Sequence, residues 1–253
     1  MKNLLKPTNL PILTAGMGGL ALVLRKLLYA LAVDEKGLLP VNHPLEVVLG
    51  ILSFGALLYI AISCWRLGGS NRYRDNFRAD PKAALGHAAA AAGIVLTLMT
   101  RPPMMANYLG DLWKVLGYIA PVCLLLAGFA QLQGRRPFFV LHLIPCLFLV
   151  FHIINHYQYW SGNPQFQDYV FTLFGSMALM FFAFYHVTFD VGSGNRRMHL
   201  GMGLAAVYLC MAELAQTLYP WLYMGGIIWV LTSLCTLKPV PKAKPKTESE
   251  QEK

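Results

Sequence analysis

Residues 135–197 contain the stretch that decides the fold, RRPFFVLHLIPCLFLVFHIINHYQYWSGNPQFQDYVFTLFGSMALMFFAFYHVTFDVGSGNRR. Two apolar runs, each long enough to cross a bilayer as a helix, are joined by a short link that has no charged residue before Asp168. Arginine pairs stand at both outer ends of this unit, at 135–136 and at 196–197. The pattern is typical of a helical hairpin in a membrane, and it predicts an all-α, polytopic membrane protein.

The composition of the whole chain agrees with lipid as the solvent. Of the 253 residues, 56% are hydrophobic and 13% are charged, whereas about 25% of a soluble domain is charged. The net charge of +9 resides in short loops and a tail, so membrane orientation explains it better than a nucleic-acid partner does. The cysteines lie inside apolar runs without a C-x-x-C spacing, so we interpret them as small buried hydrophobes.

The apolar runs predict a transmembrane helical bundle over residues 1–237, with about eight spans. The remaining residues, 238–253, are rich in proline and lysine and then acidic, which predicts a disordered cytoplasmic tail. The predicted spans are 9–33, 44–66, 82–101, 108–132, 137–157, 166–190, 198–217 and 219–237.

Lysine and arginine residues test the number of spans, because they alternate between the two sides of the membrane. Basic residues precede the first span, follow every even-numbered span and fill the tail, while the other loops hold only Lys36 and Arg101. The positive-inside rule then places both termini in the cytoplasm. Seven spans would put the basic tail outside and break the alternation.

Two recurring loop patterns suggest an internal repeat of two four-helix halves. Asn-His-Pro at 42–44 and Gly-Asn-Pro at 162–164 open the second and sixth spans, and Gly-Ser-Asn-Arg-type loops at 69–72 and 192–196 leave them. Equivalent positions in two halves of four spans would make the repeat parallel. Chance recurrence of ordinary loop residues is the alternative interpretation.

Four stretches resemble an uncharacterised family of multi-pass membrane proteins of anaerobic Gram-positive bacteria. They are DEKGLL at 34–39, HPLE at 43–46, GSNRYRDNF at 69–77 and the pattern FHxxxHYQxWSxxPQxQDY at 151–169. The resemblance implies a multi-pass architecture and a bacterial cell (plasma) membrane. It implies no activity and assigns no functional residue.

Ionisable side chains inside spans are costly unless they are paired or wetted, so they mark interior helix faces and candidate sites. The predicted orientation places one set toward the outside, where we expect a ligand-binding cavity, with Arg25 as the counter-charge of Glu213. The candidate ligand-binding residues are His152, His156, Asp168, Glu213 and Arg25. A second set lies toward the cytoplasm: His87, His142, His186, Asp190 and His199.

Three functions are compatible with these residues. Mixed charges and glycine-rich spans favour transport or binding of a small polar solute in the outward-facing cavity. The alternative is a metal-dependent membrane enzyme, in which His152 and His156, at i and i+4, bind zinc with Asp168 or Glu213. An accessory or sensor subunit of a membrane complex is the third.

The residue patterns assign no cofactor. A b-type haem would need histidines that match both His142 and His156. His186 and His199 match the inner one, but Thr172 and Glu213 occupy the outer depth, which disfavours haem. Whether the chain is an enzyme stays open.

Overall fold

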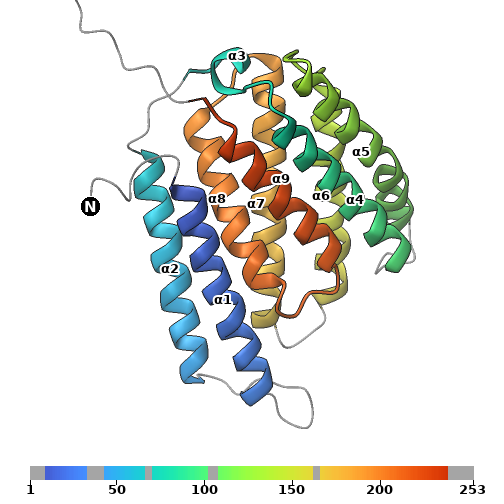
Figure 1. Ribbon diagram of the computed structural model, residues 1–253. Helices are drawn as coiled ribbons and strands as arrows, with labels where there is room; N and C mark the ends of the chain where they lie inside the picture. The colour runs from blue at the N-terminus through green and yellow to red at the C-terminus, as the bar shows by residue number, and fades with distance from the viewer. Residues whose placement is uncertain (1–8, 33–42, 66–69, 102–107, 162–165, 239–253) are drawn as a thin grey trace, which may run out of the picture.

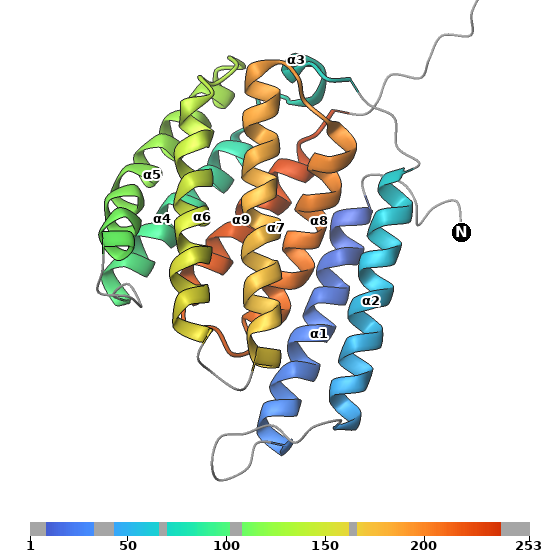
Figure 2. The same ribbon diagram turned by 180° about the vertical axis from the view of Figure 1, so that it is seen from behind.

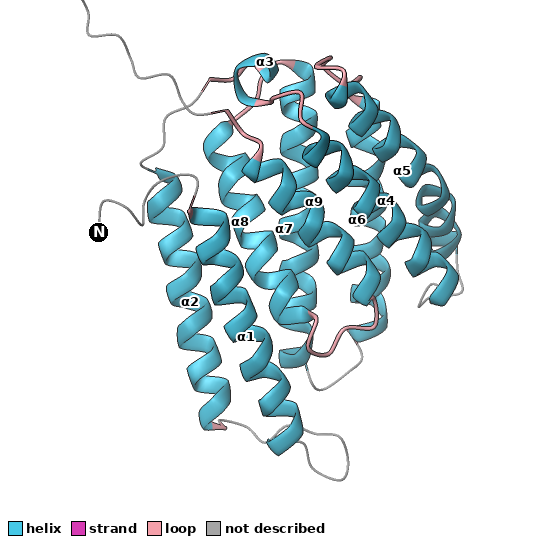
Figure 3. Ribbon diagram, in the orientation of Figure 1, coloured by secondary structure: helices cyan, strands magenta, loops and turns pink. Residues whose placement is uncertain are grey.

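The computed structural model describes residues 9–32, 43–65, 70–101, 108–161 and 166–238, except for the side chains of residues 166–168 (Figure 1). Within these ranges the secondary structure is helical, and Figure 3 shows no strand there. The helices are α1 Leu10–Ala32, α2 Pro44–Trp65, α3 Tyr73–Asn76, α4 Pro81–Thr100, α5 Tyr108–Leu132, α6 Val140–Trp160, α7 Phe166–Val191, α8 Arg196–Glu213 and α9 Pro220–Cys235. All eight predicted stretches therefore form helices, whose ends differ from the prediction by at most four residues. The predicted tail lies outside the described residues from position 239 onward.

In the part of the chain that the structure describes, six helices are long and apolar enough to cross a membrane: α1, α2, α4, α5, α6 and α7. The chain is thus a helical multi-pass membrane protein. The remaining two long helices do not meet that standard. α8 has 18 residues and includes Arg196, Arg197, His199 and Glu213, and α9 has only 16 residues. Of the eight predicted spans, six thus have the length and hydropathy of a membrane-spanning helix.

Local sequence explains where two of these helices begin. Asp80 precedes α4 and accepts a hydrogen bond from the backbone N–H of Lys82 (2.9 Å), with Pro81 at the first helical position. Asn195 precedes α8 and accepts one from the N–H of Met198 (3.2 Å). Both side chains satisfy backbone donors that the first turn of a helix leaves without partners.

The long helices form a ring of six and a pair. In the ring, α4, α5, α6, α7, α8 and α9 follow one another, and α9 closes onto α4. The pair consists of α1 and α2, both of which pack against α8 from outside the ring (Figures 1 and 2). The packing therefore divides the bundle six plus two. The prediction of two four-helix halves is wrong, because α4 packs against the last helix instead of against α1 and α2.

Small residues cause this closure of α4 onto α9. A Cβ added at Gly93 would lie 2.5 Å from the carbonyl oxygen of Trp221 on α9. One added at Gly225 would lie 2.7 Å from the carbonyl oxygen of Ala89 on α4. In membranes, helices associate through such small-residue faces because lipid supplies no hydrophobic driving force between them.

The bundle has a basic end, at which the segment before α3, the α5–α6 loop and the start of α8 gather; these hold Arg72, Arg135 and Arg196. The described chain also begins and ends on this side, and α3 covers part of it (Figure 1). Phe77, just after α3, forms an isolated antiparallel bridge with Leu237. The N–H of Gly194 donates to the carbonyl oxygen of Asn71 (3.2 Å). The two Gly-Ser-Asn-Arg-type loops are thus spatial neighbours.

Candidate functional site

Buried polar side chains gather at two levels of the bundle. The first group, here called the outer cluster, lies toward the end opposite the basic end and comprises Arg25, Thr172, Glu213, His152 and His156. The second group, here called the histidine cluster, lies toward the basic end and comprises His87, His142, His186, Asp190 and His199. Each of these ten side chains belongs to a residue that is no more than 6% exposed.

An ion pair forms the centre of the outer cluster. Nη1 of Arg25 on α1 lies 2.5 Å from Oε2 of Glu213 on α8, and it also donates to the carbonyl oxygen of Ala212 (3.2 Å). The other carboxylate oxygen of Glu213 accepts a hydrogen bond from Oγ1 of Thr172 (2.5 Å). The predicted counter-charge relation between Arg25 and Glu213 is therefore confirmed, and Thr172 on α7 adds a partner absent from the predicted site.

Aromatic rings hold the guanidinium group of Arg25 from two further sides. Its Cζ lies 4.8 Å from the ring centre of Phe171 and 5.7 Å from that of Tyr29. A cation is attracted to the face of an aromatic ring, most strongly where water is excluded. The ion pair is consequently fixed by residues from α1, α7 and α8.

A cavity of about 140 Å³ adjoins this ion pair. Its lining residues are Arg25, Tyr29, His156, Trp160, Thr172, Glu213, Gln216 and Leu218. Gln216 and Leu218 are exposed, so the mouth lies at the end of α8 that is remote from the basic end. Among the described residues, Nδ1 of His156 and Nε1 of Trp160 have no hydrogen-bond partner, and both atoms are buried beneath the cavity surface. The cavity wall thus combines an ion pair with the rings of His156 and Trp160.

The predicted residues differ in how they relate to this cavity. Arg25, Glu213 and His156 line it, while His152 lies beside it, with its ring centre 5.6 Å from that of His156 and 4.9 Å from that of Tyr219. The side chain of Asp168 lies outside the described residues. Trp160, Tyr29 and Gln216 also line the cavity, although they were not among the predicted ligand-binding residues.

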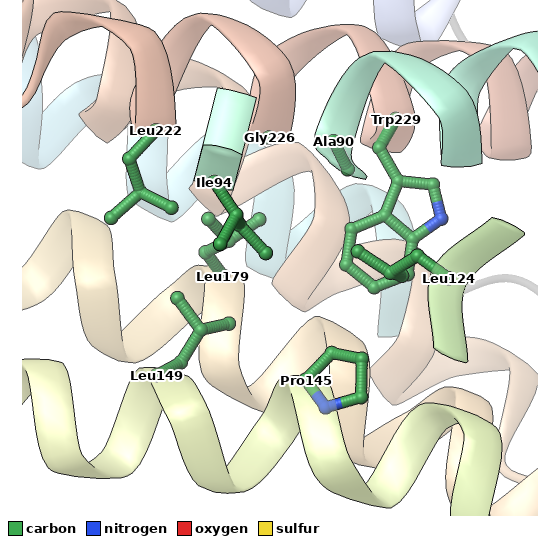
Figure 4. Close-up of a pocket in the computed structure, with 9 residues that line it drawn as sticks. All are labelled: Ala90, Ile94, Leu124, Pro145, Leu149, Leu179, Leu222, Gly226 and Trp229. Carbon is green, nitrogen blue, oxygen red and sulfur yellow. The ribbon is translucent and has the colours of Figure 1, made fainter. Parts of the chain in front are cut away.

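An apolar layer separates the two clusters at the middle of the ring. It surrounds a void of about 20 Å³ that is lined mainly by apolar side chains. Figure 4 shows the lining residues between α4, α6, α7 and α9, among them Ile94, Leu149, Leu179 and Trp229. No described pocket joins the two clusters across this layer.

The histidine cluster brings together side chains from four helices. His87 on α4 and His142 on α6 face each other, with their Nε2 atoms 3.1 Å apart. Nδ1 of His87 lies 2.8 Å from the carbonyl oxygen of Ala83, and Nδ1 of His142 lies 2.5 Å from Oδ2 of Asp190. Both ring nitrogens of His186 and of His199 are buried and have no hydrogen-bond partner among the residues that the structure describes.

The loop around α3 covers the histidine cluster at the basic end. The ring of Phe77 stacks on His186, with centres 5.2 Å apart, and contacts His199 edge-on at 5.6 Å. Asn76 anchors this loop, because its carbonyl accepts from the N–H of Lys238 and its side-chain oxygen accepts from Arg196. Burial raises the pKa of the Tyr73 phenol in the same loop, so the phenol stays neutral.

The positions of these side chains bear on the metal and haem hypotheses. Among the described residues, no three His, Cys, Asp or Glu side chains already converge on a point that could hold a metal ion. The rings of His142 and His186 stack with centres 4.7 Å apart, which leaves no gap for a haem macrocycle between them. The sequence predicted that the residues of the histidine cluster lie at one depth, but it did not assign them to the candidate ligand-binding site.

The fold and these clusters define a helical membrane protein with a polar interior. Comparison with protein-family models, with curated proteins and with solved structures found no match to this chain.

Proposed function

We propose that the protein binds a small polar solute in the cavity beside the Arg25–Glu213 pair, and that it transports this solute. The observation that carries the proposal is the cavity wall, in which a buried ion pair adjoins unpaired nitrogens of His156 and Trp160. Buried polar groups without partners cost free energy, and a bound solute would supply the missing partners once the two rings turn toward it.

The buried charges themselves support a functional role. Desolvating an ion pair costs about as much as its Coulombic attraction returns, and apolar residues of similar volume often stabilise a fold better. Ionisable residues at membrane depth are accordingly found where ions or solutes pass. The Arg25–Glu213 pair opens onto a cavity, as this role requires.

The cavity restricts the size and chemistry of the solute. An apolar cavity of about 150 Å³ in another protein holds benzene, so about 140 Å³ suits a molecule of a few heavy atoms. Arg25 and Glu213 nearly cancel in charge, which favours a neutral or zwitterionic solute. Nε1 of Trp160 can only donate, so the solute should carry an acceptor group.

Transport would require a rearrangement of the ring. The apolar layer around Leu149 and Leu179 closes the path from the cavity toward the basic end. Alternating access, in which one group of helices moves against another around a fixed site, would open that path. The pair α1 and α2 packs outside the ring and contributes Arg25, so it is the natural moving element.

The proposed orientation follows from charge. The positive-inside rule puts the basic end in the cytoplasm, so the cavity opens to the exterior of a bacterial cell membrane. Both chain termini are then cytoplasmic.

Solute-dependent stabilisation tests the binding proposal. The purified full chain in detergent should show a melting temperature raised by one member of a panel of small polar solutes. At a concentration of about 100 times Kd, binding contributes about 2.7 kcal/mol, or a shift on the order of 5 °C. The shift should disappear in Glu213→Gln, because the carboxylate charge is lost.

Glu46→Gln is the matched control for this experiment, because Glu46 lies in the first turn of α2 and does not line the cavity. It should retain the full solute-dependent shift. The proposal fails if no solute stabilises the unmodified protein, or if Glu213→Gln responds to the solute as fully as Glu46→Gln does.

A metal-dependent enzyme remains the second candidate. Nε2 of His152 and Nδ1 of His156 are both buried without a hydrogen-bond partner, and their rings are neighbours. Glu213 is a poor third ligand because Arg25 and Thr172 engage its two oxygens. Loss of bound metal in His152→Ala would identify this pair as a metal site.

A further inference from the structure

The hydrogen bond of His87 determines which of its ring nitrogens carries the proton. Nδ1 lies 2.8 Å from the carbonyl oxygen of Ala83, one turn earlier on α4, and a carbonyl oxygen can only accept. Nδ1 of His87 is therefore the donor. In a neutral imidazole the other nitrogen then has a lone pair, so Nε2 of His87 is an acceptor that points at His142.

The same reasoning applies to His142. Its Nδ1 lies 2.5 Å from Oδ2 of Asp190, and an ionised carboxylate can only accept. Nε2 of a neutral His142 is then also an acceptor. Two lone pairs would face each other across 3.1 Å, an arrangement that requires a cation between them. The candidates are an extra proton on the Asp190–His142–His87 line and a metal ion.

His186 and His199 favour the metal ion. All four of their ring nitrogens are buried without a hydrogen-bond partner, and neither residue is more than 1% exposed. A proton between His87 and His142 would leave these nitrogens unsatisfied, whereas a metal ion would give each ring a partner. Imidazole nitrogens are ligands that zinc, copper, iron and nickel accept.

The spacing of the rings suits one shared ion. With metal–nitrogen bonds of about 2.0–2.1 Å, two imidazoles in a tetrahedral site have ring centres about 5 Å apart. The observed ring-centre distances are 5.4 Å for His87–His142, 4.7 Å for His142–His186, 4.6 Å for His186–His199 and 6.0 Å for His87–His186. The first three lie within half an ångström of that value, and the fourth is about one ångström longer.

The partners of His87 and His142 resemble an outer ligand shell. A metal-binding histidine usually donates its second N–H to a carboxylate or to a backbone carbonyl, which fixes the tautomer and the ring. Asp190 does this for His142, and Ala83 does it for His87. The carboxylate of Asp190 would also offset part of the charge of a divalent ion.

We propose that the histidine cluster binds a divalent transition-metal ion such as Zn²⁺, with His87, His142, His186 and His199 as ligands and Asp190 behind His142. His186 and His199 turn about their side-chain bonds to complete the site, since their nitrogens do not yet converge with those of His87 and His142. Four protein ligands would make the site structural and closed, and the metal ion would link α4, α6, α7 and α8. This proposal is independent of the solute cavity.

Metal binding to the full chain in detergent tests the proposal. After treatment with a chelator and dialysis, the protein should take up one equivalent of Zn²⁺, measured by plasma mass spectrometry. Co²⁺ in place of Zn²⁺ should give the intense visible bands of a tetrahedral nitrogen site. His186→Ala and His199→Ala should each weaken binding about tenfold or more, and Asp190→Asn should do so by about 10–100-fold.

His152→Ala is the matched control, because His152 is equally buried but belongs to the outer cluster. It should keep one equivalent of Zn²⁺ and the tetrahedral Co²⁺ spectrum. If an alanine variant does not fold, the Co²⁺ spectrum of the unmodified protein and Asp190→Asn decide the matter. Absence of stoichiometric metal would leave the proton as the occupant and overturn the proposal. Loss of metal in His152→Ala, with retention in His186→Ala, would overturn it in favour of the His152–His156 pair.

Discussion

Replacing Arg25 with methionine should destabilise the folded protein by about 3–5 kcal/mol, because Glu213 would remain buried without its counter-charge. The side chains of Arg25 and Glu213 are only 4% and 3% exposed, so water cannot replace the lost partner. For a chain of this size the loss corresponds to a fall in melting temperature on the order of 10 °C. Thermal unfolding of the purified protein in detergent measures it.

Two further variants separate charge from packing in this result. The double variant Arg25→Met with Glu213→Met should recover most of the lost stability, since no unpaired charge stays buried. Lys114→Met breaks the Asp111–Lys114 pair, which is 3.8 Å long and well exposed, and should cost at most about 1 kcal/mol. A loss in Arg25→Met no greater than that in Lys114→Met would contradict the buried ion pair.

Gly93→Ala should produce the second large effect. The added Cβ would lie 2.5 Å from the carbonyl oxygen of Trp221 and 3.2 Å from Cα of Gly225, and both are backbone atoms that no rotamer change can move. α9 would have to shift away from α4, at a cost of about 1–3 kcal/mol or more. The melting temperature should fall accordingly.

Gly55→Ala is the matched control for the α4–α9 contact, because a Cβ at Gly55 on α2 would meet nothing within 4 Å. This substitution should leave stability unchanged or raise it slightly, since alanine has the higher helix propensity. Equal melting temperatures for Gly93→Ala and Gly55→Ala would show that α4 and α9 do not approach as closely as described.

The sequence predicted the helices well because their signal is local. Each apolar run is long enough to indicate a helix by itself, and all eight stretches are helical. The arrangement of the helices depends on contacts between distant residues, such as Gly93 with Gly225. Nothing in the sequence of either helix indicates which other helix it packs against, so the six-plus-two packing could not be predicted.

The repeat prediction failed for an instructive reason. The two loops of the expected repeat share Gly, Ser, Asn and Arg, and the structure places Gly194 next to Asn71, with the N–H of Gly194 donating to the carbonyl oxygen of Asn71. Equivalent places in two halves would have required a packing that α4 and α9 do not adopt.

The sequence could predict those contacts of the candidate site that depend only on how deep the two residues lie in the membrane. Arg25 and Glu213 lie at similar depths on helices that turn polar faces inward, and the structure pairs them. His87, His142 and Asp190 were also assigned to one depth, but only the order of the helices around the ring brings the three together. The roles of Thr172 and Trp160 depend on the cavity, and no pattern in the sequence indicates its shape.

Labelling from outside the cell tests the central claim, that the polar cavity opens to the exterior while the basic end faces the cytoplasm. Gln216 lines the cavity mouth and Gln133 lies in the loop before Arg135, and both are exposed. With the exposed Cys235 changed to serine, Gln216→Cys in intact cells should react with a membrane-impermeant maleimide, and Gln133→Cys should react only after permeabilisation. Labelling of Gln133→Cys in intact cells, with Gln216→Cys protected, would contradict the account.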